Sequence, residues 1–353
     1  MRISSLMIYE QIKKGLQGSL EELSRRNEEL ASGKRLLKPS DDVTGSSRAI
    51  DYRVNISSLE QYIRNSTTGD IQFQFTDSIL GSVSDALVEL KKLTSFGINP
   101  SDPQARQFYA QRSAMLRDYL LQLSNTRLSQ RYIFSGFMTS QESFVYNPAT
   151  FRYEYQGDLG EINIPLSNNF NVPVNIPGSK VFSTTLRGAK PSQLSDGAVV
   201  NYSESLDPLS GVNTITIEIG AQGDPEYDTF TVTNIMDMAN FLSYAWRYQH
   251  IDGSSISETK AMHRIEALSS LIDDASTQIL EKQSEMATRQ VFLNQETERI
   301  KNLLNNLKNN LSKTEDADLT EVAVEIKKAE TGLEALRIAA AKILAGSLLD
   351  FLK

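Results

Sequence analysis

Apolar residues recur at intervals of three, four and seven near the start of the chain, between residues 3 and 37. Glutamate and arginine side chains occupy the other positions, so the pattern predicts an amphipathic helix. A helix of this length extends for about 50 Å. The residues of its apolar stripe, which we expect to contact neighbouring helices, are Leu16, Leu20, Leu23 and Leu30.

A second stripe begins at residue 319, where apolar residues alternate by threes and fours as in the core positions of a coiled coil. Late in this segment Leu344, Leu348 and Phe351 broaden the apolar face beyond what one partner helix covers. We therefore expect the first and last helices to pair and further copies of the chain to pack around them. The stripe residues predicted to lie at these interfaces are Leu319, Val322, Ile326, Leu333, Leu336 and Ile343.

Both terminal helices are separated from the interior by a break. A proline disfavours the helical conformation of the residue before it, so we expect the first helix to end at Lys38. The serine or the aspartate that follows this proline is expected to cap the next helix. At the other end, a short acidic stretch interrupts the helical pattern. The predicted hinge residues are Pro39, Ser40, Asp41, Asp42, Asp316 and Asp318.

The interior combines helices with an irregular central region. Residues 44–96 and 103–131 have helical patterns, whereas 135–234 are rich in Gly, Pro, Asn, Ser and Thr. Within that region the segments TITIEI and DTFTVTN predict two paired strands. The sequence indicates a mostly α fold with an inserted β domain, an elongated rod of coiled-coil-like helices in which the N- and C-termini pair.

One interior helix, predicted over residues 257–311, has an unusual repeat. Apolar residues occur at every seventh position from Ile265 to Leu307, which is typical of a helix that lies along a partner over a long distance. The neighbouring seam is polar at Lys282, Arg289 and Glu296. This mixed seam suggests a packing arrangement more complex than a simple dimeric coiled coil.

Composition restricts the partners and the compartment. The chain has 353 residues, a formal net charge of −8 and no cysteine, so thiol nucleophiles and disulfides are excluded. Because it lacks a basic stripe, we expect no nucleic-acid partner. No apolar stretch is long enough to predict a membrane span. The first residues lack the apolar core of a secretory signal, so we expect any export to use another route.

Residues with catalytic chemistry do not form a known arrangement. His250 and His263 do not form an H-E-x-x-H motif, and neither G-x-S-x-G nor a phosphate-binding loop is present. Asp316 and Asp318 resemble the start of a calcium loop, but its twelfth position is Lys327. We expect no enzymatic activity, no cofactor and no metal, with His250 at a helix end and His263 in solvent.

Short motifs at both ends and at the exit from the helical region are distinctive: MRIS at the start, LASGKR followed by PSDD, RYIFSG, YQGD, EDAD, and SLLDFL near the end. Together they resemble the flagellin superfamily of bacterial axial proteins, and within it the hook-associated type at the hook–filament junction. The resemblance covers both helical ends strongly and the β insertion loosely.

This resemblance implies three domains: an inner-tube domain of 1–40 with 312–353, a helical rod domain of 41–136 with 258–311, and an outer, mostly β domain of 137–257. It implies a structural axial protein that joins the hook to the flagellin filament, secreted and extracellular in the bacterial flagellum. The implied partners are other copies of the chain, the hook-side junction protein, flagellin, and an export chaperone with the export apparatus.

Two alternatives remain. A flagellin-like filament subunit shares the helical ends and differs in forming a filament of its own. A secreted coiled-coil effector is also helical and poor in cysteine, but it is expected to contain a membrane-inserting apolar segment, and none is apparent in the sequence.

Overall fold

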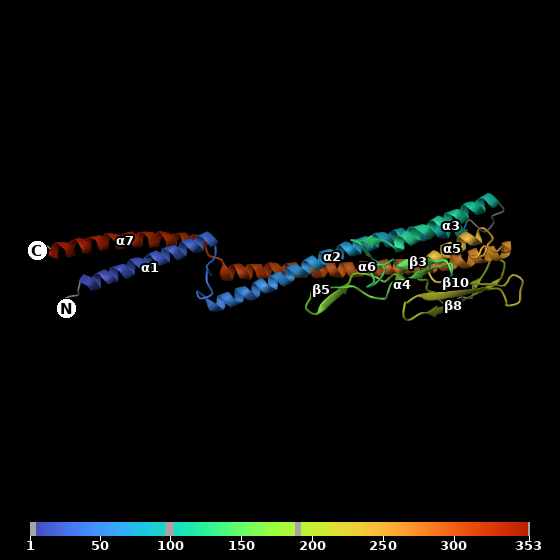
Figure 1. Ribbon diagram of the computed structural model, residues 1–353, viewed down its shortest axis with the longest axis horizontal. Coiled ribbons are helices and arrows are strands. Elements are labelled where there is room, and N and C mark those ends of the chain that lie inside the picture. Colours follow the sequence, from blue (N-terminus) through green and yellow to red (C-terminus); the bar gives the residue numbers. More distant parts are fainter. Residues whose placement is uncertain (1–4, 96–101, 188–191, 352–353) are drawn as a thin grey trace. The chain divides into compact units, whose positions relative to one another are not determined.

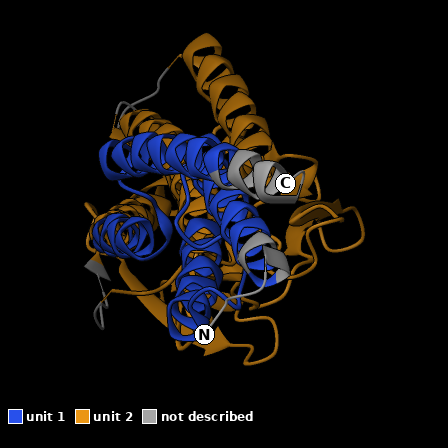
Figure 2. Ribbon diagram, turned by 90° about the vertical axis from the view of Figure 1, so that its left-hand side faces the viewer, with its two compact units in different colours: residues 1–61, 299–353 blue, residues 62–298 orange. Residues whose placement is uncertain are grey.

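Long helices form both ends of the chain in the computed structural model, which describes residues 5–95, 102–187 and 192–351 (Figure 1). The chain divides into two compact units, Met1–Gln61 with Arg299–Lys353, and Tyr62–Glu298 (Figure 2). The long helices are α1 (Ser5–Ser32), α2 (Val43–Ser95), α3 (Pro103–Ser124), α6 (Glu258–Glu315) and α7 (Leu319–Phe351).

The first unit is built on the pairing of α1 with α7. Val322 and Leu333 of α7 are buried, as are Ala49 of α2 and Ile300 and Leu304 of α6. The prediction that the first and last helices pair is therefore confirmed. Burial of Val322 and Leu333 favours the pairing of two helices that would be only marginally stable alone.

Helix α1 ends earlier than expected, at Ser32 rather than at Lys38. Gly33 adopts the left-handed conformation, with φ of +67°, and its N–H donates to the carbonyl of Glu29 at 2.9 Å. A glycine in this conformation is a common helix stop because it carries no Cβ that would clash. The prediction based on Pro39 was therefore wrong about where the helix ends.

The cap of α2 also differs from the expected one. The carboxylate of Asp42 accepts a hydrogen bond from the N–H of Gly45 at 2.8 Å, so Asp42 caps the helix. Asp41 instead accepts from the N–H of Lys38 at 2.9 Å and closes the turn before it. Pro39 and Ser40 are exposed in this connection.

The second unit holds the β structure. Three hairpins follow α3, and further along the chain an antiparallel sheet has the strand order β10-β9-β8-β7. The hairpins are β1 (Arg127–Leu128) with β2 (Arg131–Tyr132), β3 (Phe144–Asn147) with β4 (Arg152–Tyr155), and β5 (Asn163–Ser167) with β6 (Phe170–Pro173). The sheet strands are β7 (Ser192–Gln193), β8 (Val199–Leu206), β9 (Asn213–Ile219) and β10 (Asp228–Val232).

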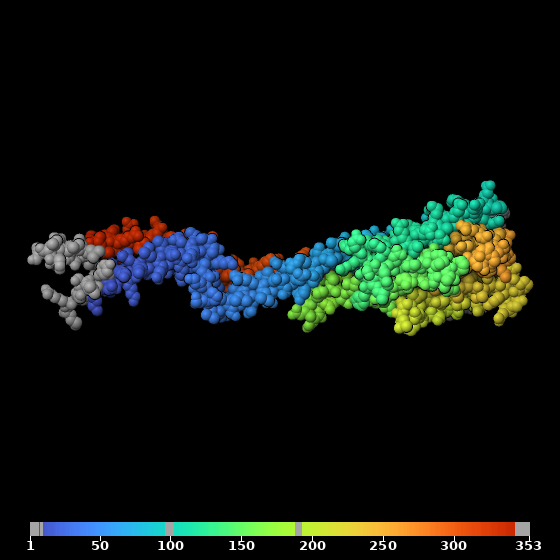
Figure 3. Space-filling view, in the orientation of Figure 1, coloured from blue at the N-terminus to red at the C-terminus, as the bar shows by residue number. Residues whose placement is uncertain are grey.

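The predicted strand pair is confirmed as β9 with β10, and so is the mostly α fold with inserted β structure. Of two short helices, α4 (Gly178–Phe182) lies between β6 and β7 in the sequence, and α5 (Ile235–Ala245) follows β10. On the face of the second unit seen in Figure 3, the green and yellow β segments form a continuous layer beside α2.

The seven-residue repeat of α6 forms the core of the second unit. Ile272, Ile279 and Leu293 are fully buried, and Trp246 packs against Tyr109 with ring centroids 5.0 Å apart. The polar neighbouring seam contacts the β structure of the same chain, because Arg289 donates to the carbonyls of Pro173 and Asn175. Its polarity therefore has an explanation within one chain.

The expectation that His263 is solvated was wrong. Its side chain is buried, and Nε2 lies 2.6 Å from a carboxylate oxygen of Asp196. His250 contacts the buried pair formed by Arg264 and Asp228, with Arg264 donating to His250 Nδ1 at 2.6 Å. Both histidines thus have structural contacts in this unit.

Asp237, in the first turn of α5, joins that helix to the β structure. Its carboxylate accepts from the N–H of Tyr153 at 3.0 Å and from the hydroxyl of Thr233 at 2.6 Å. Only 1% of the residue is exposed. Burial raises the pKa of Asp237 to about 6 against the opposing effect of these hydrogen bonds.

This raised pKa predicts a pH-dependent stability. Because the folded protein holds the proton more tightly than an unfolded Asp with a pKa of 3.8, the contribution of Asp237 is greatest below pH 4 and falls as the pH rises through 6. The free energy of unfolding of the wild type should fall by about 2 kcal/mol relative to Asp237→Asn between pH 4 and 7. Denaturant titrations at both pH values measure this difference.

The exposed Asp224→Asn variant is the matched control and should show no such pH-dependent difference. Stability curves for the wild type and Asp237→Asn that stay parallel across this range would show that the carboxylate titrates as it does in the unfolded chain.

Candidate assembly site of the terminal helices

The apolar stripes of α1 and α7 are only partly covered by one another. In α7, Val322 and Leu333 are buried, whereas Leu20 and Leu30 in α1 and Leu319 in α7 are 47%, 43% and 51% exposed. The half-buried members of the two stripes are Leu16, Leu23, Ile326 and Leu336. The side chain of Ile343 lies outside the described residues.

Further aliphatic side chains on α7 extend the uncovered surface. Val324 and Ile338 are about half exposed, beside the buried positions Val322 and Leu333. A helix pair buries only the sides that face each other, so apolar residues on the flanks of the stripes stay in contact with water. Exposed apolar surface on this scale is typical of an interaction site.

Within α1 an ionic group lies at the buried edge of the pair. Glu29 is buried and accepts a hydrogen bond from Arg26 at 2.9 Å, and Arg25 lies 3.7 Å from its other oxygen. The hydrogen bond with Glu29 raises the pKa of Arg26 above its usual value. These pairs compensate the buried carboxylate, which otherwise would be costly to keep charged.

The connection that follows α1 and the connection between α6 and α7 lie side by side and are hydrogen-bonded to each other. Arg35 N–H donates to the carbonyl of Glu315 at 2.7 Å, and Ala317 N–H donates to the carbonyl of Gly33 at 2.9 Å. Lys34 and Asp316 form an antiparallel bridge. The breaks at both ends of the chain therefore meet in one short backbone junction.

A buried carboxylate fixes this junction. Glu315, the last residue of α6, is 5% exposed, and its oxygens contact Lys34 Nζ at 2.7 Å and the guanidinium of Arg53. Burial acts to raise the pKa of Glu315, but the hydrogen bonds and charges of Lys34 and Arg53 outweigh it, and the pKa is lowered. The two cations also offset the unfavourable placement of an acid at the negative end of a helix.

Asp318 begins the next helix, since its side chain accepts from the N–H of Thr320 at 2.9 Å. Among the predicted hinge residues, Asp42 and Asp318 thus cap the helices that leave the junction. The group formed by Glu315, Lys34 and Arg53 was not predicted from the sequence. One signal was present in the sequence: a basic cluster precedes one break and an acid precedes the other. The sequence gave no indication that these residues are in contact, because they lie far apart along the chain.

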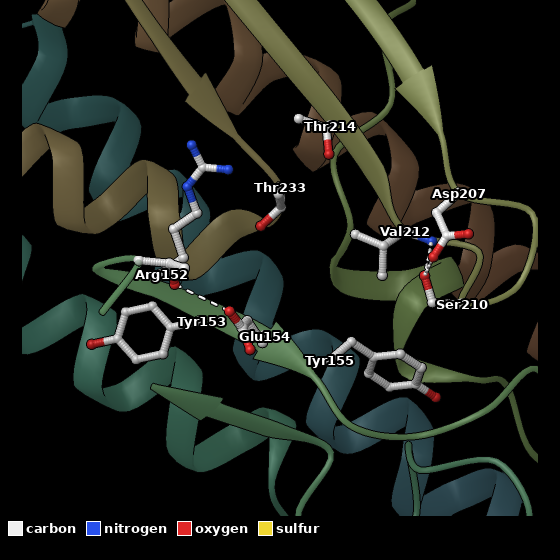
Figure 4. A pocket seen from close by; sticks show the side chains of 10 residues that line it. Arg152, Tyr153, Glu154, Tyr155, Asp207, Ser210, Val212, Thr214 and Thr233 are labelled. Carbon is white, nitrogen blue, oxygen red and sulfur yellow. Dashed lines mark hydrogen bonds between the residues drawn. The ribbon is translucent and has the colours of Figure 1, made fainter. Parts of the chain in front are cut away.

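A cavity of about 550 Å³ in the second unit lies between β4 and the loop that joins β8 to β9 (Figure 4). Its charged side chains already have partners. Arg152 donates to Thr231, Glu154 accepts from Asn147 at 2.7 Å, and Asp207 accepts from Ser210 at 2.6 Å. The arrangement provides neither a nucleophile paired with a base nor a convergent set of free acids.

Within the described ranges, no group of three or more His, Asp or Glu residues is placed to hold a metal ion. The helices described here also include none that combines the length and the apolar character needed to cross a bilayer. The partly uncovered stripes of the terminal helices, with their junction, form the candidate functional site.

Comparison with known proteins gives matches at both ends of the chain. The family described as the bacterial flagellin N-terminal helical region matches residues 3–139, and the bacterial flagellin C-terminal helical region matches residues 269–352. Together these two matches cover more than half of the chain.

Among individual relatives, flagellar hook-associated protein 3 of Escherichia coli K12 is 25% identical over 242 residues, which is 68% of this chain and 74% of that protein. The protein of the same name from Salmonella typhimurium is 27% identical over 59% of this chain and 65% of its own length, slightly under two thirds. A flagellin from Listeria monocytogenes is 27% identical over 33% of this chain and 42% of its own length.

A solved structure with a similar fold is flagellar hook-associated protein 3 from Legionella pneumophila, with a TM-score of 0.58 at 17% identity over 74% of this chain and 97% of that chain. A putative flagellar hook-associated protein from Vibrio parahaemolyticus also has a TM-score of 0.58, at 15% identity over 78% of this chain and all of its own. At these identities the similarity shows the fold.

The junction predicts the effect of removing its carboxylate. Glu315→Ala leaves Lys34 and Arg53 without this partner, and because both cations are half exposed the cost is about 1–2 kcal/mol. Opening of the connection should then expose Lys34, Arg35 and Lys38 to trypsin, so cleavage there should be faster than in the wild type. Peptide mapping after brief digestion measures the rate.

The control is Glu28→Ala, which removes an exposed acid from α1. Since the pKa of Glu315 is lowered from 4.5, its stabilisation is present above that pH and lost as the pH falls through the folded pKa. The difference between Glu315→Ala and wild type should therefore shrink in acid. Equal cleavage of both variants at pH 7 would contradict the proposed role of this carboxylate.

Proposed function

The chain belongs to the bacterial flagellin family, and on this premise we propose that it is a structural axial protein of the flagellum that joins the hook to the flagellin filament. The observation that carries the proposal is the extent of similarity. Hook-associated protein 3 matches about twice as much of the chain as flagellin does. As a member of this family, the protein is structural and not an enzyme.

The half-covered terminal stripes are the physical basis for assembly. Residues such as Leu20, Leu30 and Leu319 remain exposed after α1 and α7 have paired, so further copies gain apolar burial by packing around the pair. We propose the two stripes, including Ile343, as subunit interfaces. The breaks at 33–42 and 316–318 would separate these tube-forming segments from the rest of the chain.

The proposal retains the three-part organisation: 1–40 with 312–353 as the inner tube, 41–136 with 258–311 as the rod, and 137–257 as the outer domain. It places the protein outside the cell, after export through the flagellar apparatus with a chaperone. Its neighbours would be its own copies, the hook-side junction protein and flagellin. The similarity to flagellin at the helical ends leaves a filament subunit as the competing function.

The stripe predicts a variant that folds but does not hold the filament. Leu20→Asp puts a charge at an exposed position, so the α1–α7 pair should form while each contact with a neighbouring copy loses about 2 kcal/mol or more. Cells that carry this variant should shed flagellin into the medium instead of retaining filaments. Immunoblots of medium and cell-bound fractions measure the distribution.

Gln17→Asp, which introduces the same charge at an exposed polar position of α1, is the matched control and should retain filaments. Leu333→Asp places the charge inside the pair and should lower helicity as well, which circular dichroism detects. Normal filaments and swimming in Leu20→Asp would show that this position faces no neighbour.

An adaptor and a filament subunit differ in how their assembly ends. An adaptor must prefer different partners at its two ends, which requires contacts that disfavour its own kind. A filament subunit repeats one heterologous contact without closing. Added to hook fragments that carry the other junction protein, this protein should therefore form a short zone and stop. Flagellin added afterwards should polymerise from that zone, as electron microscopy can follow.

Growth of long filaments from this protein alone would replace the junction function with that of a filament subunit. Hook fragments without the other junction protein are the control, and they should not be extended.

A further inference from the structure

Helix α3 carries an exposed ridge without charge. Its exposed positions, at successive intervals of three or four, are Gln104, Phe108, Gln111, Met115, Tyr119 and Gln122. The three large side chains project strongly, because Phe108, Met115 and Tyr119 are 60%, 62% and 43% exposed. We call these six residues the α3 ridge. Large exposed side chains on a helix already packed on its other sides are typical of a second contact surface.

Helix α6 carries a ridge of the opposite character. Its exposed positions, also at intervals of three or four, are Thr277, Leu280, Ser284, Ala287, Val291 and Gln295. We call these the α6 ridge. Its centre consists of small side chains, while Leu280 and Val291 on either side are 55% and 56% exposed. Small residues flanked by aliphatic ones form a shallow surface that accepts larger side chains from a partner.

The two hydroxyl groups of the α6 ridge need no further partner. The hydroxyl of Thr277 donates to the carbonyl of Asp273 at 2.9 Å, and the hydroxyl of Ser284 donates to that of Leu280 at 2.8 Å. Because these hydrogen bonds lie within the helix, covering Thr277 and Ser284 leaves neither hydroxyl unsatisfied. The surface can therefore lose its water at little cost.

Charges beside both ridges are already paired within the chain. Near the α6 ridge, Glu281 contacts Arg187 and Asp273 contacts Lys91. Near the α3 ridge, Arg112 contacts Glu89 and Arg117 contacts Asp118. Neither ridge thus presents an unpaired charge that would attract a strongly charged partner, and the matching neutral surface for each is displayed by the chain itself.

The two ridges also match in length. One spans 104–122 and the other 277–295, so each extends for about 27 Å along its helix. Both are exposed in the same chain, so they do not cover each other there. We propose that the α3 ridge of one copy packs on the α6 ridge of a second copy, with the large side chains of α3 over the small centre of α6. This inference rests on the proposed function, since it places the contact between copies in the flagellum.

The size of this contact explains why it needs an assembly. A surface about 27 Å long and about 10 Å wide provides only a few hundred Å² per partner, below the roughly 800 Å² of a stable interface. A pair of free copies should therefore not persist in dilute solution. Copies that the terminal helices already hold together gain the contact as an intramolecular event at high effective concentration.

Cross-linking tests the contact without interference, because the chain has no cysteine. Met115 and Ala287 lie near the midpoints of their ridges, so they meet whether the two helices run parallel or antiparallel. Cells would express Met115→Cys and Ala287→Cys chains together, and their isolated flagella would be oxidised mildly. We expect a disulfide-linked dimer that contains one chain of each kind, and we expect none from dilute secreted protein.

The control replaces Met115→Cys by Leu209→Cys, which is 88% exposed on another part of the same unit. A dimer no more abundant than in this control would overturn the inference, as would a dimer formed by either single variant alone, which indicates a symmetric contact. A photoreactive maleimide on the Ala287→Cys chain provides a second arm. Its attachment to flagellin or to another protein, and not to this chain, would also overturn the inference.

The proposed function fails in a different way. If immunoblots find the chain absent from isolated flagella, the axial role is overturned, and the inference that depends on it falls as well. If the chain is present in flagella but gives no mixed dimer, the function stands and the ridge contact is wrong.

Discussion

The buried carboxylate of Glu315 is the constraint on which the first unit depends. A carboxylate that is removed from water must be matched by cations, and here one comes from the connection after α1 and the other from α2. Lys34 and Arg53 can meet it only if the end of α6 lies beside the end of α1. The backbone bonds between Arg35 and Glu315, and between Ala317 and Gly33, then fix where α7 begins. One side chain thus holds the connection after α1 and the start of α7 at a common point.

This junction determines how the apolar stripes are divided. Once α1 and α7 leave it as neighbours, the sides that face each other are buried, as at Val322 and Leu333, and the flanks remain exposed, as at Leu20 and Leu319. A pair of helices has no third element to cover those flanks. The exposed residues therefore follow from the geometry of a helix pair, and they form the surface that we propose for assembly with further copies.

The sequence predicted the features that depend on periodicity. The stripes of α1 and α7, the buried repeat of α6 and the β9–β10 pair all follow from patterns within short segments. Prediction from the sequence was less successful where two local signals compete. The end of α1 is set by Gly33 in the left-handed conformation, whereas the predicted end was based on Pro39. Long-range pairs such as Glu315 with Lys34, or His263 with Asp196, could not be predicted, because their partners are defined only by the fold.

The two kinds of surface have different consequences for growth. When the α3 ridge of one copy binds the α6 ridge of the next, the copy at one end of the assembly keeps a free α3 ridge and the copy at the other end keeps a free α6 ridge. Further copies can therefore add until the assembly closes into a ring or extends as a helix. This contact therefore contains no signal to stop. A protein that joins the hook to the filament must stop, so the ridges are suited to binding copies within the zone, while the limit of the zone must be set elsewhere. The terminal stripes are left half covered, and we propose them as the surface on which discrimination between self and partner occurs.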